Sequence, residues 1–233
     1  MRTIRPRLRV LKFVGEELAG CVHVDVCAPR TAAVGSAAMP HPFASQDEFE
    51  DRKFDGLDLR DGVVEGVAFH HCTFTACTFT GTRWLRCRFV DCTFVRCDLS
   101  NIKPLGTLLR DTSFTETKLL GVDWTAAAEF GRPVFQTCVL DYGSFAGRDM
   151  RRAKLKECVA RETDFSDANL TEAVFDGTDL NGARFRHTNL SRADLRKASN
   201  YAISPVDNTL KQARFSLPEA IGLLHGLGIL LDD

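Results

Sequence analysis

The chain has 233 residues, a formal net charge of −1, 44% hydrophobic residues and 26% charged residues. This composition is typical of a soluble globular protein and excludes disordered, collagen-like and strongly basic nucleic-acid-binding chains. No stretch reaches the roughly 18 consecutive apolar residues of a membrane span, and the N-terminus does not resemble a secretory signal. The 9 cysteines, an odd number without such a signal, favour reduced thiols in the cytoplasm.

Residues 1–45 carry no repeat and are predicted to form a partly irregular leader. The segment from Ala28 to Pro42 is rich in Ala, Gly, Ser and Pro, which favours turns and loops. Before it, residues 21–26 read Cys-Val-His-Val-Asp-Val, so that valine alternates with other side chains as in a β-strand. This pattern predicts a short edge strand or cap. Met39 is an alternative start of the protein because the repeat begins shortly after it.

The region from 46 to 215 repeats with a period of five residues. Large apolar side chains stand at every fifth position from Phe49, and fifteen of the 17 phenylalanines occupy these centres. Two positions before many centres the side chain is small, usually Cys, Thr or Ala. A period of five fits neither a helix nor a flat strand, so we expect a chain that turns a corner every five residues. Four sides then close a square coil, and coils stack at the strand spacing of about 4.8 Å.

Two irregularities interrupt the repeat. One extra residue enters between Thr125 and Glu129, which predicts a bulge or kink between two stacked segments near 125–129. Pro104 occupies a centre without changing the phase, which predicts a local distortion. Because both Pro104 and Trp124 belong to the face that also holds Val64 and Trp84, we expect that face to be the irregular one.

The last residues, 216–233, change in character. Ser216 and Glu219 have the spacing of a helix capping box, which predicts a helix through about Leu224 that ends at Gly226 or Gly228. The apolar side chains that follow could cover the open end of the coil stack, join two copies of the chain, or do both. The residues assigned to this cap or dimer contact are Ile221, Leu224, Leu227 and Ile229.

The repeat unit itself suggests a family. Residues 168–172 read Ala-Asn-Leu-Thr-Glu and residues 193–197 read Ala-Asp-Leu-Arg-Lys, each a small residue, Asp or Asn, a large apolar residue and two polar residues. This pattern resembles the pentapeptide-repeat family. The resemblance implies an all-β fold, a right-handed quadrilateral parallel β-helix with a C-terminal capping helix.

The residues give little support for catalysis or metal binding. Seven cysteines occupy the small inward register, which predicts buried reduced thiols that stack as Cys72 with Cys92, Cys77 with Cys97, and Cys138 with Cys158. His70 and His71 beside Cys72 suggest zinc, but the repeat phase points the histidines outward and the cysteine inward. No phosphate-binding loop, metalloprotease motif or nucleophile elbow is present. We therefore expect no enzyme activity, cofactor or metal.

Charge changes sign in blocks along the repeat, and one block holds six acidic residues without a basic residue between them. Because four repeats make one coil, we predict that this block surrounds the rod as an acidic belt. The alternative is a solvated surface on which opposite charges pair along the rod axis. The acidic belt consists of Glu162, Asp164, Asp167, Glu172, Asp176 and Asp179.

The resemblance extends to the Qnr and MfpA type of pentapeptide-repeat protein, which protects DNA gyrase and topoisomerase IV. It implies a non-enzymatic DNA mimic whose acidic belt enters the DNA-binding surface of the topoisomerase, which protects against quinolones or peptide toxins. It also implies a homodimer through the C-terminal helix, and we expect no direct contact with nucleic acid or membrane. The second hypothesis is a cytosolic scaffold that binds an unrelated protein through its flat β faces. Negative potential gathered along one side of the rod would favour the first hypothesis, and mixed potential on every face the second.

Overall fold

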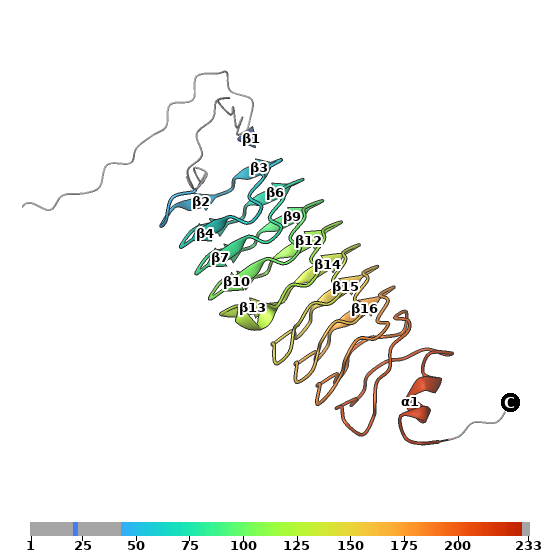
Figure 1. Ribbon diagram of the computed structural model, residues 1–233. Coiled ribbons are helices and arrows are strands. Elements are labelled where there is room, and N and C mark those ends of the chain that lie inside the picture. Colours follow the sequence, from blue (N-terminus) through green and yellow to red (C-terminus); the bar gives the residue numbers. More distant parts are fainter. Residues whose placement is uncertain (1–20, 23–42, 230–233) are drawn as a thin grey trace, which may run out of the picture.

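The chain winds into a rod of stacked coils, with the N-terminal coils at one end and the short helix α1 at the other (Figure 1). The structure is a computed structural model that describes residues 21–22 and 43–229. The predictions for residues 1–20 and 23–42, including the start at Met39, lie outside this range. All pairings between strands in the described range are parallel, which confirms the predicted β-helix.

We number the four faces of the coil in chain order. Face 3 consists of isolated parallel bridges between residues one coil apart, from Asp58–Thr78 to Asp179–Ser199. Beyond residue 140, bridges of the same kind also continue faces 1, 2 and 4. Face 1 contains β2 (Glu48–Glu50), β5 (Ala68–His70), β8 (Arg88–Val90), β11 (Leu108–Arg110) and β13 (Glu129–Gly131). Face 2 contains β1 (Cys21–Val22), β3 (Lys53–Asp55), β6 (Thr73–Thr75), β9 (Thr93–Val95), β12 (Ser113–Thr115), β14 (Val134–Gln136), β15 (Lys154–Lys156) and β16 (Val174–Asp176). Face 4 contains β4 (Val63–Glu65), β7 (Arg83–Leu85) and β10 (Lys103–Leu105).

Large side chains at the centres fill the axis of the rod. The rings of Phe74 and Phe94, one coil apart, are nearly parallel, with centroids 4.7 Å apart, and Phe94 stacks in turn on Phe114 at 5.3 Å. Each of these rings is completely buried. Phe43, which precedes the repeat, packs edge-on against Phe54, which stacks on Phe74, and so covers the N-terminal end of this column. Because the stack leaves little space inside, only the outer faces remain for contact with other molecules.

The small register next to the centres also forms hydrogen bonds. The Thr82 hydroxyl donates to the Leu59 carbonyl at 2.7 Å, and the Cys87 thiol donates to the Val64 carbonyl at 3.2 Å. Thr and Cys are therefore favoured here because they are small and can satisfy a buried backbone carbonyl of the preceding coil. The seven cysteines with described side chains are buried free thiols, and burial raises the pKa of the Cys87 thiol.

The corners of the coil place one residue of most repeats in the left-handed backbone region. This residue lies two positions after the centre, and in many repeats it is not glycine. Thr137 has φ 54° at such a corner, where a β-branched side chain is strained. The fold thus tolerates backbone strain at its corners because the inward side chains on both sides are locked in the core.

The extra residue predicted near 125–129 is accommodated by a 3₁₀ helix, η1 (Trp124–Ala126). The pairing offset along face 1 is 20 residues for Arg88–Leu108 and 21 residues for Leu108–Glu129. Arg148 stands in the small register one coil later, and its Nη1 donates to the Ala127 carbonyl at 3.0 Å. The guanidinium thus braces the backbone that the insertion pushes out of the regular coil.

The distortion predicted at Pro104 is wrong. Pro104 is buried in the middle of β10 and pairs in register with Trp84 of β7. Proline has no N–H to donate, but β10 is the last strand of its sheet, and η1 follows in the next coil. Pro104 therefore lacks an N–H only towards the next coil, where no further strand of this sheet follows.

The ends of the repeat are closed differently. β1 pairs with β3, so the strand predicted within residues 21–26 is present at Cys21–Val22. The predicted capping box is wrong: Ser216 Oγ donates to the Arg196 carbonyl, and the N-cap of α1 is Ala220 without a side-chain bond. The Ser216 hydroxyl still serves the coil stack, so it is not available to the helix. α1 runs from Ile221 to His225 and ends at Gly226, as expected.

Candidate binding surface

The acidic belt does not lie on one face of the rod. Asp179 lies on face 3, and Asp164 lies in the bridge ladder that continues face 4. Asp176 is the last residue of β16 on face 2, and Glu172 precedes that strand at the corner between faces 1 and 2. The block surrounds the rod, as predicted, so it does not present one continuous acidic surface.

Basic side chains of neighbouring coils neutralise most of the acidic belt. Arg161 Nε lies 2.7 Å from Asp179 Oδ2, and Arg184 Nη2 lies 3.2 Å from Asp164 Oδ2. Further ion pairs join Lys197 to Asp176 and both Arg152 and Arg192 to Glu172, and His187 Nδ1 lies 3.4 Å from Asp167 Oδ1. Within the described part of the chain, Glu162 is the one belt residue with no basic side chain at ion-pair distance, and Asp167 has only the imidazole of His187. These contacts match the predicted alternative in which charges pair along the rod axis.

Two of the belt carboxylates also hold the backbone. Asp164 Oδ1 accepts a hydrogen bond of 2.9 Å from the Ser166 backbone N–H, and Asp179 Oδ1 accepts one of 3.1 Å from the Asn181 N–H. Burial opposes ionisation of Asp164, but the bonds from Ser166 and Arg184 outweigh it and lower the pKa of this carboxyl. The Asp or Asn of the repeat motif is therefore a turn residue, and its charge is only partly available to a partner.

A group of acidic side chains without ion pairs lies outside the belt, in the first coil. In the described coils, four exposed carboxylates of the first coil, Glu50, Asp51, Asp55 and Asp61, have no ion pair. This group was not singled out from the sequence, although its charges are visible there. The ion pairs of the acidic belt could have been anticipated by adding one coil length of 20 residues to a residue number, since residue 164 then faces residue 184.

The C-terminal apolar residues remain exposed. The exposed fractions of Ile221 and Leu224 are both 38%, and those of Leu227 and Ile229 are 50% and 43%. Only Leu223 of α1 packs against the core. These four side chains therefore keep between about two fifths and one half of their surface exposed, while Leu223 contacts the core at the open end.

The repeat phase correctly predicts that the cysteine side chains at residues 72 and 77 point inward and that the histidine side chain at residue 71 points outward. Cys72 and Cys77 are buried, whereas His71 is exposed and lies 3.6 Å from Asp91. Among the described residues no group of three metal-binding side chains is found. No helix in the described part of the chain has the length and apolar character to cross a membrane.

Comparison with known families decides the relationship. The model of the pentapeptide repeat region matches residues 67–145, and that of pentapeptide repeats in 8 copies matches residues 149–186 and 175–199. The chain belongs to the pentapeptide-repeat family. No curated protein sequence matches this pentapeptide-repeat protein.

Two solved structures share its fold at low sequence identity. QnrB1 in a trypsin-treated form, described as a plasmid-mediated fluoroquinolone resistance protein, is 18% identical with a TM-score of 0.60. The match covers 81% of this chain and 93% of QnrB1. HetL, described as involved in heterocyst differentiation regulation in the cyanobacterium Nostoc sp. strain PCC 7120, is 17% identical with a TM-score of 0.56, over 74% of this chain and 88% of HetL. These likenesses establish the fold, which serves different roles in the two proteins.

Proposed function

We propose that this pentapeptide-repeat protein is a non-enzymatic binding protein that acts in the cytoplasm through the outer faces of its rod. The observation that carries the proposal is the filled interior: aromatic and aliphatic side chains occupy the axis from Phe43 to Ile203. Chemistry inside the coil would need open space, which this core does not provide, and the Thr82 hydroxyl and Cys87 thiol inside it already donate to backbone carbonyls. Binding at an exposed, regular surface is the role that remains.

We further propose that the partner is DNA gyrase or topoisomerase IV, which the rod protects from a quinolone or a peptide toxin as a DNA mimic. Support comes from the similarity of fold to QnrB1, which extends over nearly the whole of that chain. Acidic residues of the rod would attract the basic DNA-binding surface of the enzyme. Because most of the acidic belt is paired, we place the main contact on Glu162 and the unpaired carboxylates of the first coil.

The exposed apolar residues of the C-terminus support a homodimer in this proposal. Ile221, Leu224, Leu227 and Ile229 lie together beyond the last coil and would bury their side chains against a second copy. A dimer of this kind would double the length of the rod. Sedimentation of the protein with and without Leu227→Ser tests it, since loss of this side chain should shift a dimer towards monomer.

The test of the topoisomerase proposal is a gyrase supercoiling assay with a quinolone and increasing amounts of the protein. We expect rescue or inhibition at micromolar concentrations. Glu162→Lys should weaken the effect, and Glu116→Lys is the matched control because both residues occupy left-handed corner positions, with φ 55° and 49°. No effect of the protein at any concentration would refute the topoisomerase role.

The second candidate is a scaffold that binds an unrelated protein through its flat faces. Ion pairs such as Arg161–Asp179 and Arg184–Asp164 favour it, because they give the faces mixed potential. A scaffold would leave the supercoiling assay unchanged. It would still associate with its partner when the acidic belt is neutralised by Asn substitutions, which keep the turns.

A further inference from the structure

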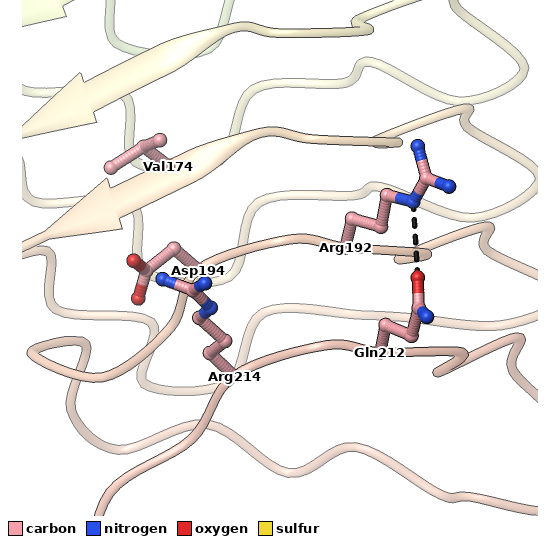
Figure 2. A pocket seen from close by; sticks show the side chains of 5 residues that line it. All are labelled: Val174, Arg192, Asp194, Gln212 and Arg214. Atoms are coloured by element: carbon pink, nitrogen blue, oxygen red, sulfur yellow. Dashed lines mark hydrogen bonds between the residues drawn. The ribbon is translucent and has the colours of Figure 1, made fainter.

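A hollow of about 580 Å³ lies on the edge where faces 1 and 2 meet, near the C-terminal end of the rod. Val174, Arg192, Asp194, Gln212 and Arg214 line it (Figure 2). Arg192 and Gln212 extend from neighbouring coils, and Arg192 Nε donates to Gln212 Oε1 at 3.1 Å. The Gln212 amide nitrogen and the guanidinium of Arg214 carry further donors on the same edge.

A second hollow of about 580 Å³ adjoins the first towards the N-terminus. Arg110, Arg132, Arg151 and Arg152 line it, together with Gly131. Gly131 stands opposite Arg110 in the strand pairing, and its missing side chain leaves a gap in the row of long side chains. Glu172 joins the two hollows, because it lines the second and pairs with Arg192 of the first.

Arginine outnumbers free carboxylate along this groove. Arg110 holds Glu129 with two hydrogen bonds of 2.9 and 2.8 Å, and Arg151 holds Asp149 in the same two-fold manner. Glu172 is shared between Arg152 and Arg192, so one carboxylate serves two cations.

In the C-terminal hollow, Arg192 and Arg214 outnumber the one carboxylate, that of Asp194. Arg196 holds both oxygens of Asp194, at 2.9 and 2.6 Å. Arg214 makes no ion pair within the described range. The groove therefore ends in cations whose N–H groups are not all used, and its carboxylates are already bound.

From this groove we infer a binding site for an extended acidic segment of a protein partner, centred on Arg192 and Arg214. A guanidinium offers a planar pair of donors that matches a carboxylate, and successive arginines along the groove can engage successive acidic side chains. None of the residues that line the two hollows is aromatic, so the groove lacks the stacking surfaces that favour single-stranded nucleic acid. The inference rests on the proposed function only in that the ligand is a protein, and it does not require gyrase.

The experiment measures fluorescence anisotropy of a labelled octaglutamate peptide with the whole protein at low salt. We expect saturable binding that weakens as salt is raised, and none of an octaglutamine peptide. Arg192→Gln combined with Arg214→Gln should weaken binding on the order of tenfold. Arg96→Gln is the matched control, since Arg96 and Arg192 both occupy left-handed corners and Arg96 has no ion pair in the described coils.

A variant that is expected to bind more tightly distinguishes loss of the binding site from loss of the fold. Asp194→Asn removes the one carboxylate of the C-terminal hollow and frees Arg196, and Asn169 accepts the same turn hydrogen bond elsewhere in the rod. We expect Asp194→Asn to bind octaglutamate more tightly than the wild type. Absence of octaglutamate binding, equal loss in Arg96→Gln, or tighter binding of an oligothymidylate of equal charge would overturn the inference. Failure of the supercoiling assay would refute the topoisomerase proposal without affecting the inferred site for an acidic segment, so the two proposals can be refuted separately.

Discussion

Replacement of Asp164 separates the structural role of the acidic belt from a role in binding. Asp164→Ala removes the acceptor for the Ser166 N–H and the partner of Arg184 together. Asp164→Asn keeps an acceptor oxygen for the turn and removes only the charge. Arg184→Gln removes the ion pair and leaves the turn intact.

The magnitudes follow from the exposure of the two groups. The side chain of Asp164 is 22% exposed, so the hydrogen bond from Ser166 contributes about 1 kcal/mol to the free energy of unfolding. The Arg184 side chain is 63% exposed, so its ion pair contributes about 0.5 kcal/mol. We therefore expect a loss of about 1.5 kcal/mol for Asp164→Ala, and about 0.5 kcal/mol for Asp164→Asn and for Arg184→Gln.

Urea unfolding at pH 7, followed by far-ultraviolet circular dichroism, measures these differences. The four proteins should unfold with the same dependence on urea concentration and with different midpoints. Equal losses for the Ala and Asn variants would show that the turn hydrogen bond contributes nothing. No loss in either variant would mean that Asp164 is free to serve a partner, and our account of the belt would be wrong.

Three further predictions concern stability. The side-chain bonds from Arg151 and Arg196 hold the pKa of Asp149 and Asp194 below the usual range, so this stabilisation is complete above the unfolded pKa of about 4 and is lost as the pH falls through the folded pKa. The urea midpoint should be level from neutral pH to about pH 5 and then fall, and a level midpoint in stronger acid would contradict this. Phe94→Ala should cost about 4 kcal/mol in guanidinium unfolding, because it empties a buried site between two stacked rings, and a loss below about 1 kcal/mol would refute the stacking argument. Thr137→Gly should stabilise the rod by about 0.5–1 kcal/mol in urea, since relief of a left-handed β-branched residue exceeds the entropic cost of glycine, and a destabilised variant would show that the corner is not strained.

Much of the architecture could be predicted because its period is short. The fivefold repeat places Phe74, Phe94 and Phe114 one above another, and the stacked rings of the structure confirm it. The one-residue slip could also be located, since the change of phase is visible in the sequence. The form that the slip takes could not be predicted, because Arg148 reaches the Ala127 carbonyl at the end of η1 from the next coil.

The candidate surface was harder to predict. The sequence shows which residues are acidic, but the ion pairs of Asp164 and Asp179 join residues about one coil apart. The capping box predicted at Ser216 is wrong for a similar reason. Its hydroxyl donates to the Arg196 carbonyl, 20 residues earlier, and does not cap the helix. A local pattern is reliable only where no group of a neighbouring coil claims the same donor or acceptor.

The sequence by itself therefore determined the coil, its inward residues and the position of the slip, because burial of a large side chain at every fifth residue leaves the backbone one regular way to fold. Only the tertiary structure decided which charges remain available. It paired Glu172 with two arginines, left four carboxylates of the first coil unpaired, and opened a groove above Gly131. The physical reason is that charge interactions act between side chains that meet through space, and in a stacked coil those side chains lie a full turn apart in the chain.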